Sequence, residues 1–272
     1  MAEGGTPGRK VTIREIAKMK PEGRRIVVVT AYDVLFARLV DSSGVDVVLV
    51  GDSVGNVVAG FETTLPVTLD NMIYHGSAVR RGVQRALLVV DMPFLTYQAS
   101  QESAILNCGR VMQETGADAV KLEGGSAEIV ATIAALTRIG IPVMAHLGFT
   151  PQSIRMMGMR VQGREASDAD RMVEQARAIE EAGAFSIVLE LVPGALAARV
   201  TESVSIPTIG IGAGPSCDGQ VLVLPDLLGL NESFSPRFLK RYAELGSVVR
   251  SAVGNYADEV RAGQYPSADH SN

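Results

Sequence analysis

Four acidic side chains lie at the carboxyl ends of short apolar runs, where a parallel sheet would gather them. Asp52, Asp91, Glu123 and Glu190 each come within two residues of the end of such a run. One such residue would usually be a helix N-cap or turn former, the role we assign to Asp33. Four carboxylates at one edge would repel one another, and a bound cation relieves that repulsion. All-oxygen ligation favours a hard ion, so the pattern predicts a Mg²⁺-type site.

Lys121 adds a positive charge to this pattern. It is the only lysine between Lys20 and Lys240, and it stands two residues before Glu123 in an apolar run. Residues two apart on a strand point to the same side, so both side chains should face one region. Lys121 is then either a point charge for a substrate carboxylate or half of a buried structural ion pair.

Glu190 and His146 are the candidates for proton chemistry. Glu190 follows an apolar run and is the best candidate for a base that removes a proton α to a carbonyl. His146 ends another run. A histidine at such a position is a candidate metal ligand, general acid, substrate hydrogen-bond donor or structural hydrogen-bonder. The residues alone therefore lead to metal-assisted enolisation of an oxo acid, and they leave the electrophile open.

The elements that must position these residues are eight short, β-branched runs separated by helix-period segments. This alternation predicts a (β/α)₈ TIM barrel, with a doubly wound open sheet as the alternative. Against the open sheet, no glycine-rich fingerprint follows the first run. The predicted strands are Ile26–Thr30, Val45–Val50, Ala86–Val90, Ala119–Leu122, Pro142–Ala145, Ser186–Leu189, Pro207–Gly210 and Val221–Leu224.

Helical spacing predicts the segments between the strands, with N-caps at Asp33, Ser100 and Asp168. We expect a single barrel domain over residues 12–265, a disordered N-terminal tail over 1–11 and a C-terminal tail over 266–272. The predicted helices are Val34–Ser43, Leu69–Arg81, Gln101–Glu114, Glu128–Arg138, Asp168–Ala182, Gly194–Ser203 and a long one from Arg237 to about Arg261.

Two connections are long and stand on the face of a barrel that carries active sites. They run from Ser53 to Thr68 after the second strand and from Gly148 to Ser167 after the fifth. Length on that face usually reflects function, so we expect both loops to contribute to the site.

Composition narrows the class of protein. Hydrophobic residues make up 47% of the 272 residues, and 25 basic against 30 acidic residues give a net charge of −5. This charge argues against a nucleic-acid or anionic-membrane binder, and no run is long enough to span a bilayer. The polar start does not resemble a signal peptide, and the two cysteines, Cys108 and Cys217, give little reason to expect a disulfide. A cytoplasmic protein with small-molecule or protein partners is the simplest expectation.

Six motifs in register resemble the ketopantoate hydroxymethyltransferase family, also called 3-methyl-2-oxobutanoate hydroxymethyltransferases. The resemblance runs from about Thr12 to about Tyr265. The motifs are Val50-Gly51-Asp52-Ser53, Asp91-Met92-Pro93-Phe94, Val120-Lys121-Leu122-Glu123-Gly124-Gly125, His146-Leu147-Gly148-Phe149-Thr150-Pro151-Gln152-Ser153, Leu189-Glu190-Leu191-Val192-Pro193 and Gly210-Ile211-Gly212-Ala213-Gly214.

The resemblance implies a barrel of the phosphoenolpyruvate/pyruvate type and a reaction. A hydroxymethyl group would pass from methylene-tetrahydrofolate to α-ketoisovalerate, giving ketopantoate on the route to pantothenate and coenzyme A. Glu190 would accept the substrate proton. The family also forms large homo-oligomers, typically decamers, so a homo-decamer is expected. The two long loops are the candidates for contact with the folate.

The resemblance also assigns the ligands, residue by residue. Asp52 and Asp91 would hold one Mg²⁺ per subunit, with Glu123 at the same ion, directly or through water. Asp52, Ser53, Asp91 and Lys121 would form the binding site for the oxo acid.

Two other functions are compatible with the same set of residues. A related Mg²⁺-dependent barrel lyase or mutase would act on carbon–carbon or carbon–phosphorus bonds of oxo acids without folate. A barrel that only binds an oxo acid, as a sensor or scaffold, would not need the candidate base Glu190.

Overall fold

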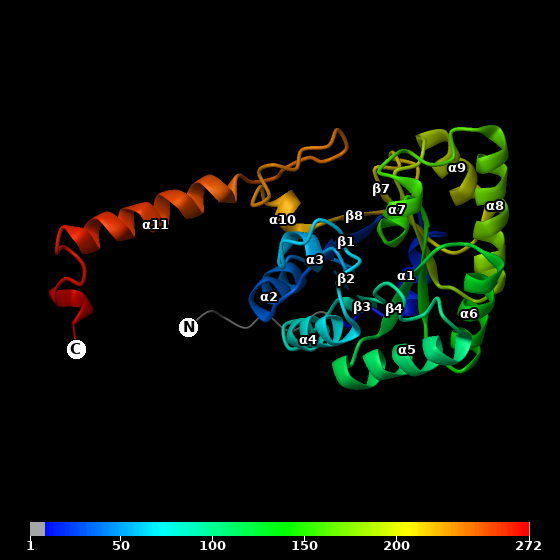
Figure 1. The fold of residues 1–272 in the computed structure, drawn as a ribbon, viewed down its shortest axis with the longest axis horizontal. Coiled ribbons are helices and arrows are strands. Elements are labelled where there is room, and N and C mark those ends of the chain that lie inside the picture. The colour runs from blue at the N-terminus through cyan, green and yellow to red at the C-terminus, as the bar shows by residue number, and fades with distance from the viewer. Residues whose placement is uncertain (1–8, 272) are drawn as a thin grey trace. The chain divides into compact units, whose positions relative to one another are not determined.

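Eight parallel strands close into a barrel in the order in which they occur along the chain (Figure 1). The computed structural model describes residues 9–271. Closure confirms the predicted (β/α)₈ barrel, and the doubly wound alternative is wrong. The strands are β1 Ile26–Thr30, β2 Val47–Val50, β3 Leu87–Asp91, β4 Ala119–Glu123, β5 Val143–Gly148, β6 Ser186–Glu190, β7 Thr208–Ile211 and β8 Gly219–Leu222.

Helices lie between the strands, and α4, α5, α6, α8 and α9 cover the outside of the barrel (Figure 1). The two long loops contain short helices of their own, α3 after β2 and η1 with α7 after β5. The helices of the barrel unit are α1 Ile13–Met19, α2 Val34–Ser42, α3 Val54–Val57, α4 Leu69–Arg80, α5 Gln101–Thr115, α6 Ala127–Arg138, η1 Pro151–Ser153, α7 Ile154–Met157, α8 Ala166–Glu181 and α9 Gly194–Ser203.

Inward-facing side chains fill the barrel in rows that lead to the functional residues. Ala119 lies in the buried core cluster. Because side chains alternate along a strand, Lys121 and Glu123 continue its row toward the carboxyl end of β4. The same alternation extends the row of Val89 to Asp91. The lower layers are therefore aliphatic, and the last layer of this side of the barrel is charged.

Two N-caps were predicted correctly and one was wrong. The side chains of Asp33 and Ser100 accept backbone hydrogen bonds at the starts of α2 and α5. Helix α8 instead begins at Ala166 after Glu165, and Asp168 lies in its first turn. An acidic residue is favoured by the helix dipole anywhere in the first turn, so the sequence signal does not separate these positions.

Strand β8 begins two residues before its predicted start. Gly219, its first residue, pairs with Ile26 of β1. A Cβ at Gly219 would lie 2.4 Å from the carbonyl oxygen of Ile26. A glycine selected for close approach carries no apolar signal, which is why the pattern missed it.

The chain divides into two compact units, one ending at Val223 and the other beginning at Leu224. The second unit contains α10 Leu224–Leu227, α11 Leu245–Arg261 and η2 Ala268–His270. Helix α11 begins eight residues after the predicted start at Arg237, because Arg241 of the preceding segment donates to main-chain oxygens of an irregular loop. A single domain over 12–265 stays a prediction.

The predicted N-terminal tail is partly ordered. Residues 1–8 of that prediction lie outside the described part of the chain. Val11, by contrast, is buried in the core cluster, and its N–H donates to the oxygen of Arg85 over 2.7 Å. An ordered turn, η2, occupies part of the predicted C-terminal tail.

Cys108 and Cys217 are both buried and free. Among the described residues, no helix is long and apolar enough to cross a membrane.

Candidate active site

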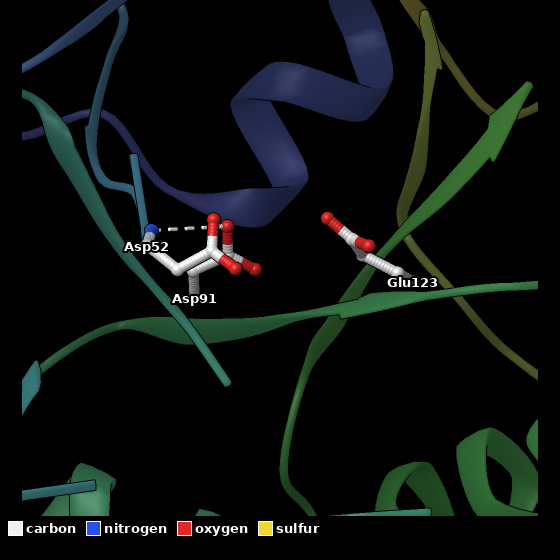
Figure 2. A group of neighbouring side chains, drawn as sticks. All are labelled: Asp52, Asp91 and Glu123. Atoms are coloured by element: carbon white, nitrogen blue, oxygen red, sulfur yellow. Dashed lines mark hydrogen bonds between the residues drawn. The ribbon is translucent and has the colours of Figure 1, made fainter. Parts of the chain in front are cut away.

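Three carboxylates meet at the carboxyl end of the barrel. Asp52 follows β2, Asp91 ends β3 and Glu123 ends β4. One oxygen from each lies within 4.8 Å of the others, and all three residues are buried. Figure 2 shows the Glu123 carboxylate pointing toward the two aspartates, with the Asp52 N–H directed at Asp91. The structure therefore brings together the three residues that the resemblance named as metal ligands.

The electrostatics of this cluster fit a cation. Burial raises the pKa of Asp52 well above its usual range, and the charges of Asp91 and Glu123 raise that pKa further. Burial also raises the pKa of Asp91, although Lys121 opposes the shift. Asp91 Oδ1 is buried without a hydrogen-bond donor from the described residues, and Glu123 Oε1 has only the longer contacts to His146 Nδ1 at 3.4 Å and Lys121 Nζ at 3.8 Å. Acceptors left without donors among crowded carboxylates are what a hard metal ion would satisfy.

Lys121 lies inside the cluster. Its Nζ is 2.6 Å from Asp91 Oδ2 and 3.8 Å from Glu123 Oε1. Burial opposes its charge, but the neighbouring carboxylates outweigh that cost and raise its pKa above the usual value. The ion pair that the sequence left open as an alternative is thus present, and it coexists with a position beside the metal candidates.

His146 connects Glu123 to the candidate base. Its Nδ1 lies 3.4 Å from Glu123 Oε1, and its Nε2 lies 3.3 Å from Glu190 Oε2. Burial and Lys121 lower the pKa of this imidazole, but Glu123 and Glu190 outweigh them and raise it to about 9. The position of His146 between two carboxylates is a feature that the sequence did not indicate. The same arrangement holds the pKa of Glu123 below its usual range against the effect of burial.

Glu190 is the most accessible carboxylate of this group, because 19% of its side chain is exposed while that of Glu123 is 3% exposed. Two unusual backbone positions hold it. Leu191, the next residue, has a positive φ of 47°, which is rare for a residue with a side chain. Gly148 packs so closely that a Cβ there would meet the Glu190 carbonyl oxygen.

Ser53 has a partner that the sequence analysis did not identify. Its Oγ lies 2.8 Å from the hydroxyl of Tyr32, which follows β1. The Tyr32 carbonyl is in turn 2.7 Å from Nδ1 of His75. Tyr32 stands two residues beyond a strand end, which is the signal that would have placed it at the barrel mouth.

Gln152 is the second residue that was missed. It lies in η1 and is buried, and its side-chain nitrogen donates to Asp52 Oδ2 over 3.0 Å. Its side-chain oxygen accepts from the hydroxyl of Tyr97, which is also buried, over 2.9 Å. Gln152 stood inside a motif that carried the family resemblance, but an amide in a loop has no pattern that predicts its partners.

A cavity of about 390 Å³ adjoins the cluster. Glu123, Tyr97 and Gln152 form part of its wall, and the rest comes from the loops after β3, β4 and β5, from the end of β5 and from α6 and α8. The loop after β2 does not contribute to its wall. Apolar and amide side chains that line it include Ile129, Leu147, Met157, Met172, Gln162 and Gln175.

This geometry supports one kind of chemistry. Buried oxygens can hold a hard cation, Lys121 and Ser53 offer donors to an anionic substrate, and Glu190 can accept a proton from a nearby carbon acid. The adjoining cavity leaves room for a second substrate.

Comparison with known proteins agrees with this site. The sequence profile of the ketopantoate hydroxymethyltransferase family matches residues 10–268. The chain is 60% identical to 3-methyl-2-oxobutanoate hydroxymethyltransferase of Pelobacter propionicus, over 97% of each chain. It is 55% identical to the protein of the same name from Trichlorobacter lovleyi, over 97% of this chain and 98% of that one.

The fold has relatives outside this family. A solved structure of 2,3-dimethylmalate lyase, a member of the PEP mutase/isocitrate lyase superfamily, matches with a TM-score of 0.59 at 17% identity. The match covers 96% of this chain and 91% of that one, and at this identity it shows the fold alone. From the profile, the close relatives and the residues of the site, the chain belongs to the ketopantoate hydroxymethyltransferase family and is an enzyme of that type.

Proposed function

We propose that this enzyme transfers a hydroxymethyl group from methylene-tetrahydrofolate to α-ketoisovalerate by Mg²⁺-assisted enolisation, giving ketopantoate for pantothenate and coenzyme A synthesis. The names of the close relatives support the ketopantoate-forming reaction. The observation that carries the mechanism is the buried group of Asp52, Asp91 and Glu123, whose ligand atoms lie within 4.8 Å of one another.

Asp52 and Asp91 would hold one Mg²⁺ per subunit, with Glu123 at the same ion, directly or through a water. The buried Asp91 Oδ1, which lacks a donor among the described residues, supports this assignment. When bound, Mg²⁺ supplies Lewis-acid polarisation of the keto oxygen of the substrate.

Lys121 and Ser53 would fix the carboxylate end of the oxo acid, with Asp52 and Asp91 completing that site. Lys121 has a spare donor for this purpose, because an ammonium has three N–H groups and its closest contact is Asp91. The hydroxyl of Tyr32 keeps Ser53 Oγ in place.

Glu190 would then take the methine proton of the substrate, and the resulting enolate carbon would form a bond to the methylene carbon, which loses its two C–N bonds to the folate. Water would add its hydroxyl group to the same carbon. The methine proton and the remaining proton of water would go to the two folate nitrogens, so that tetrahydrofolate leaves. His146, 3.3 Å from Glu190 Oε2, would restrain the position of the base. The exposed fraction of Glu190 gives the substrate access to this carboxylate.

The cavity beside Glu123 would hold the folate. Its apolar walls suit the faces of a bicyclic ring, and amides such as Gln162 and Gln175 suit its polar edge. This assignment favours the loop after β5 over the loop after β2, which had been an equal candidate from the sequence.

A homo-oligomer in the cytoplasm is the proposed state of the enzyme. The exposed apolar side chains of α11 support assembly, because such faces are usually covered in a complex. The decamer itself remains a prediction from the family resemblance.

The test is product formation from α-ketoisovalerate and methylene-tetrahydrofolate, with Mg²⁺ and with excess chelator. We expect ketopantoate only with both the folate and the metal, and Asp91→Asn should need a higher Mg²⁺ concentration for half-maximal rate. Turnover of oxo acids without folate would instead support the barrel lyase or mutase. Unchanged turnover in chelator would refute the metal assignment.

A further inference from the structure

One buried residue, Gln152, links the ends of several neighbouring strands. From the loop after β5 its side chain reaches Asp52 after β2 and Met92 after β3, and its main-chain N–H reaches Glu123 at the end of β4.

The hydrogen bonds of the Gln152 amide fix which way it faces. Its Nε2 donates to Asp52 Oδ2 over 3.0 Å and to the Met92 carbonyl oxygen over 2.8 Å. Its Oε1 accepts from Tyr97 and Gln98, each over 2.9 Å. A flipped amide would set its oxygen against a carbonyl that can only accept and its nitrogen against an amide donor, so the alternative orientation is excluded.

The main chain of Gln152 acts on a second carboxylate. Its N–H donates to Glu123 Oε2 over 3.0 Å. Tyr97 reinforces this contact, because its hydroxyl accepts from the Glu123 N–H over 3.0 Å while also holding the Gln152 side chain.

Each carboxylate of the cluster consequently has one oxygen held by the protein. Gln152 holds Asp52 Oδ2 and Glu123 Oε2, and Lys121 holds Asp91 Oδ2. Asp91 Oδ1 has no donor among the described residues, and Glu123 Oε1 has only the longer contacts to His146 at 3.4 Å and Lys121 at 3.8 Å.

We propose that Gln152 is a positioning residue: by holding one oxygen of Asp52 and one of Glu123, it turns the other oxygen of each carboxylate toward a divalent cation. The inference rests on the proposed metal site. Partners that orient metal ligands typically change affinity about 10- to 100-fold when they are removed. Because the main-chain contact to Glu123 survives a side-chain substitution, we expect the lower part of that range.

The experiment measures Mg²⁺ affinity by calorimetry, with no oxo acid present, for wild type and Gln152→Met. Methionine has similar volume and no hydrogen-bonding amide, so the donor to Asp52 is lost. Thr208→Val is the matched control, because it also removes a buried hydrogen-bonding group. Thr208 is the first residue of β7, at the end of the barrel away from the metal candidates, and its hydroxyl donates to Asp218 over 3.1 Å.

We expect the Mg²⁺ dissociation constant of Gln152→Met to rise about tenfold, while Thr208→Val leaves it unchanged. Equal affinity in Gln152→Met and wild type would overturn the inference and leave the metal site intact. Absence of Mg²⁺ binding by folded wild type would instead overturn the proposed metal site.

Tyr97→Phe decides the matter if Gln152→Met does not fold. It removes the hydroxyl that orients both Gln152 and Glu123 and keeps the ring. A severalfold weaker Mg²⁺ affinity supports the inference, and an unchanged affinity in the folded variant overturns it.

Discussion

Lys121 neutralises part of a charge cluster that is buried away from water. Its closest partner is Asp91 Oδ2 at 2.6 Å, and removing one member of a buried pair leaves the other uncompensated. We predict that Lys121→Met lowers the free energy of unfolding by about 3–5 kcal/mol without metal. Adding Mg²⁺ should raise the melting temperature of this variant more than that of wild type, because the ion supplies the missing positive charge.

Lys20→Met is the control for this prediction. Lys20 pairs with Asp218 at 3.2 Å and donates to main-chain oxygens after α9, away from the metal candidates. This variant should also lose stability, and Mg²⁺ should not recover it preferentially. Equal Mg²⁺ effects in both variants, measured by thermal melting, would contradict the placement of Lys121 at a metal site.

The sequence predicted the charged residues of the site better than the neutral ones. Asp91, Lys121 and Glu123 were found because strand ends and side-chain alternation fix where they point. Gln152 and Tyr97 were missed because their partners lie on other loops, so their roles depend on how the loops pack. His146 was found without a role, since only the closed barrel sets it between two carboxylates.

The contact between β5 and β6 depends on a glycine at the end of β5. Gly148 has φ of +95°, and a Cβ there would lie 2.2 Å from the Glu190 carbonyl oxygen. Gly148→Ala should therefore lower the free energy of unfolding by about 3 kcal/mol and reduce kcat, because the base is displaced.

Gly109→Ala provides the comparison within α5. An added Cβ meets nothing within 4 Å there, and alanine favours a helix interior. Urea unfolding should show this variant unchanged or more stable by up to about 1 kcal/mol, with unchanged kcat. Similar behaviour of the two alanine variants would refute the close-approach argument.

Cys108 faces inward from α5 and affects stability at high pH. Burial raises its pKa to about 12, above the value of about 8.5 for an unfolded thiol. The stabilisation is complete below the unfolded pKa and is lost as pH rises, because the unfolded thiol ionises first. Between pH 8 and 9.5, the free energy of unfolding should fall about 1 kcal/mol more in wild type than in Cys108→Ala. Parallel urea curves for the two proteins at both pH values would disprove this effect.

Most elements could be predicted because most residues of the barrel strands are buried, so most strands read as short apolar runs. The predicted bounds and caps were wrong where a residue serves a purpose other than burial of an apolar side chain. Strand β8 begins at Gly219, which is needed for close approach to β1, and Asp168 serves the first turn of α8 instead of its cap.

The exposed apolar side chains of helix α11 are the observation that supports assembly of the enzyme into an oligomer. Only Gly246 of this helix is buried, while its apolar side chains are exposed. Val253→Glu, at a position with 60% exposure, should shift the enzyme to smaller species in sedimentation velocity. Ser251→Glu adds the same charge on the polar side of the helix and should leave the mass unchanged. The same mass for both variants would contradict a role for this face in assembly.

The first half of the reaction, removal of the methine proton, needs no folate, so it can show by itself whether Glu190 and Mg²⁺ enolise the substrate. Proton NMR would follow the methine signal of α-ketoisovalerate in D₂O with wild type and Glu190→Gln, with Mg²⁺ or chelator, before and after methylene-tetrahydrofolate is added. We expect Mg²⁺-dependent loss of the methine signal in wild type and at least about 100-fold slower loss in Glu190→Gln. A hydroxymethyl signal should appear only after methylene-tetrahydrofolate is added. Equal exchange in both proteins, or none in folded wild type, would contradict enolisation by Glu190 at this site.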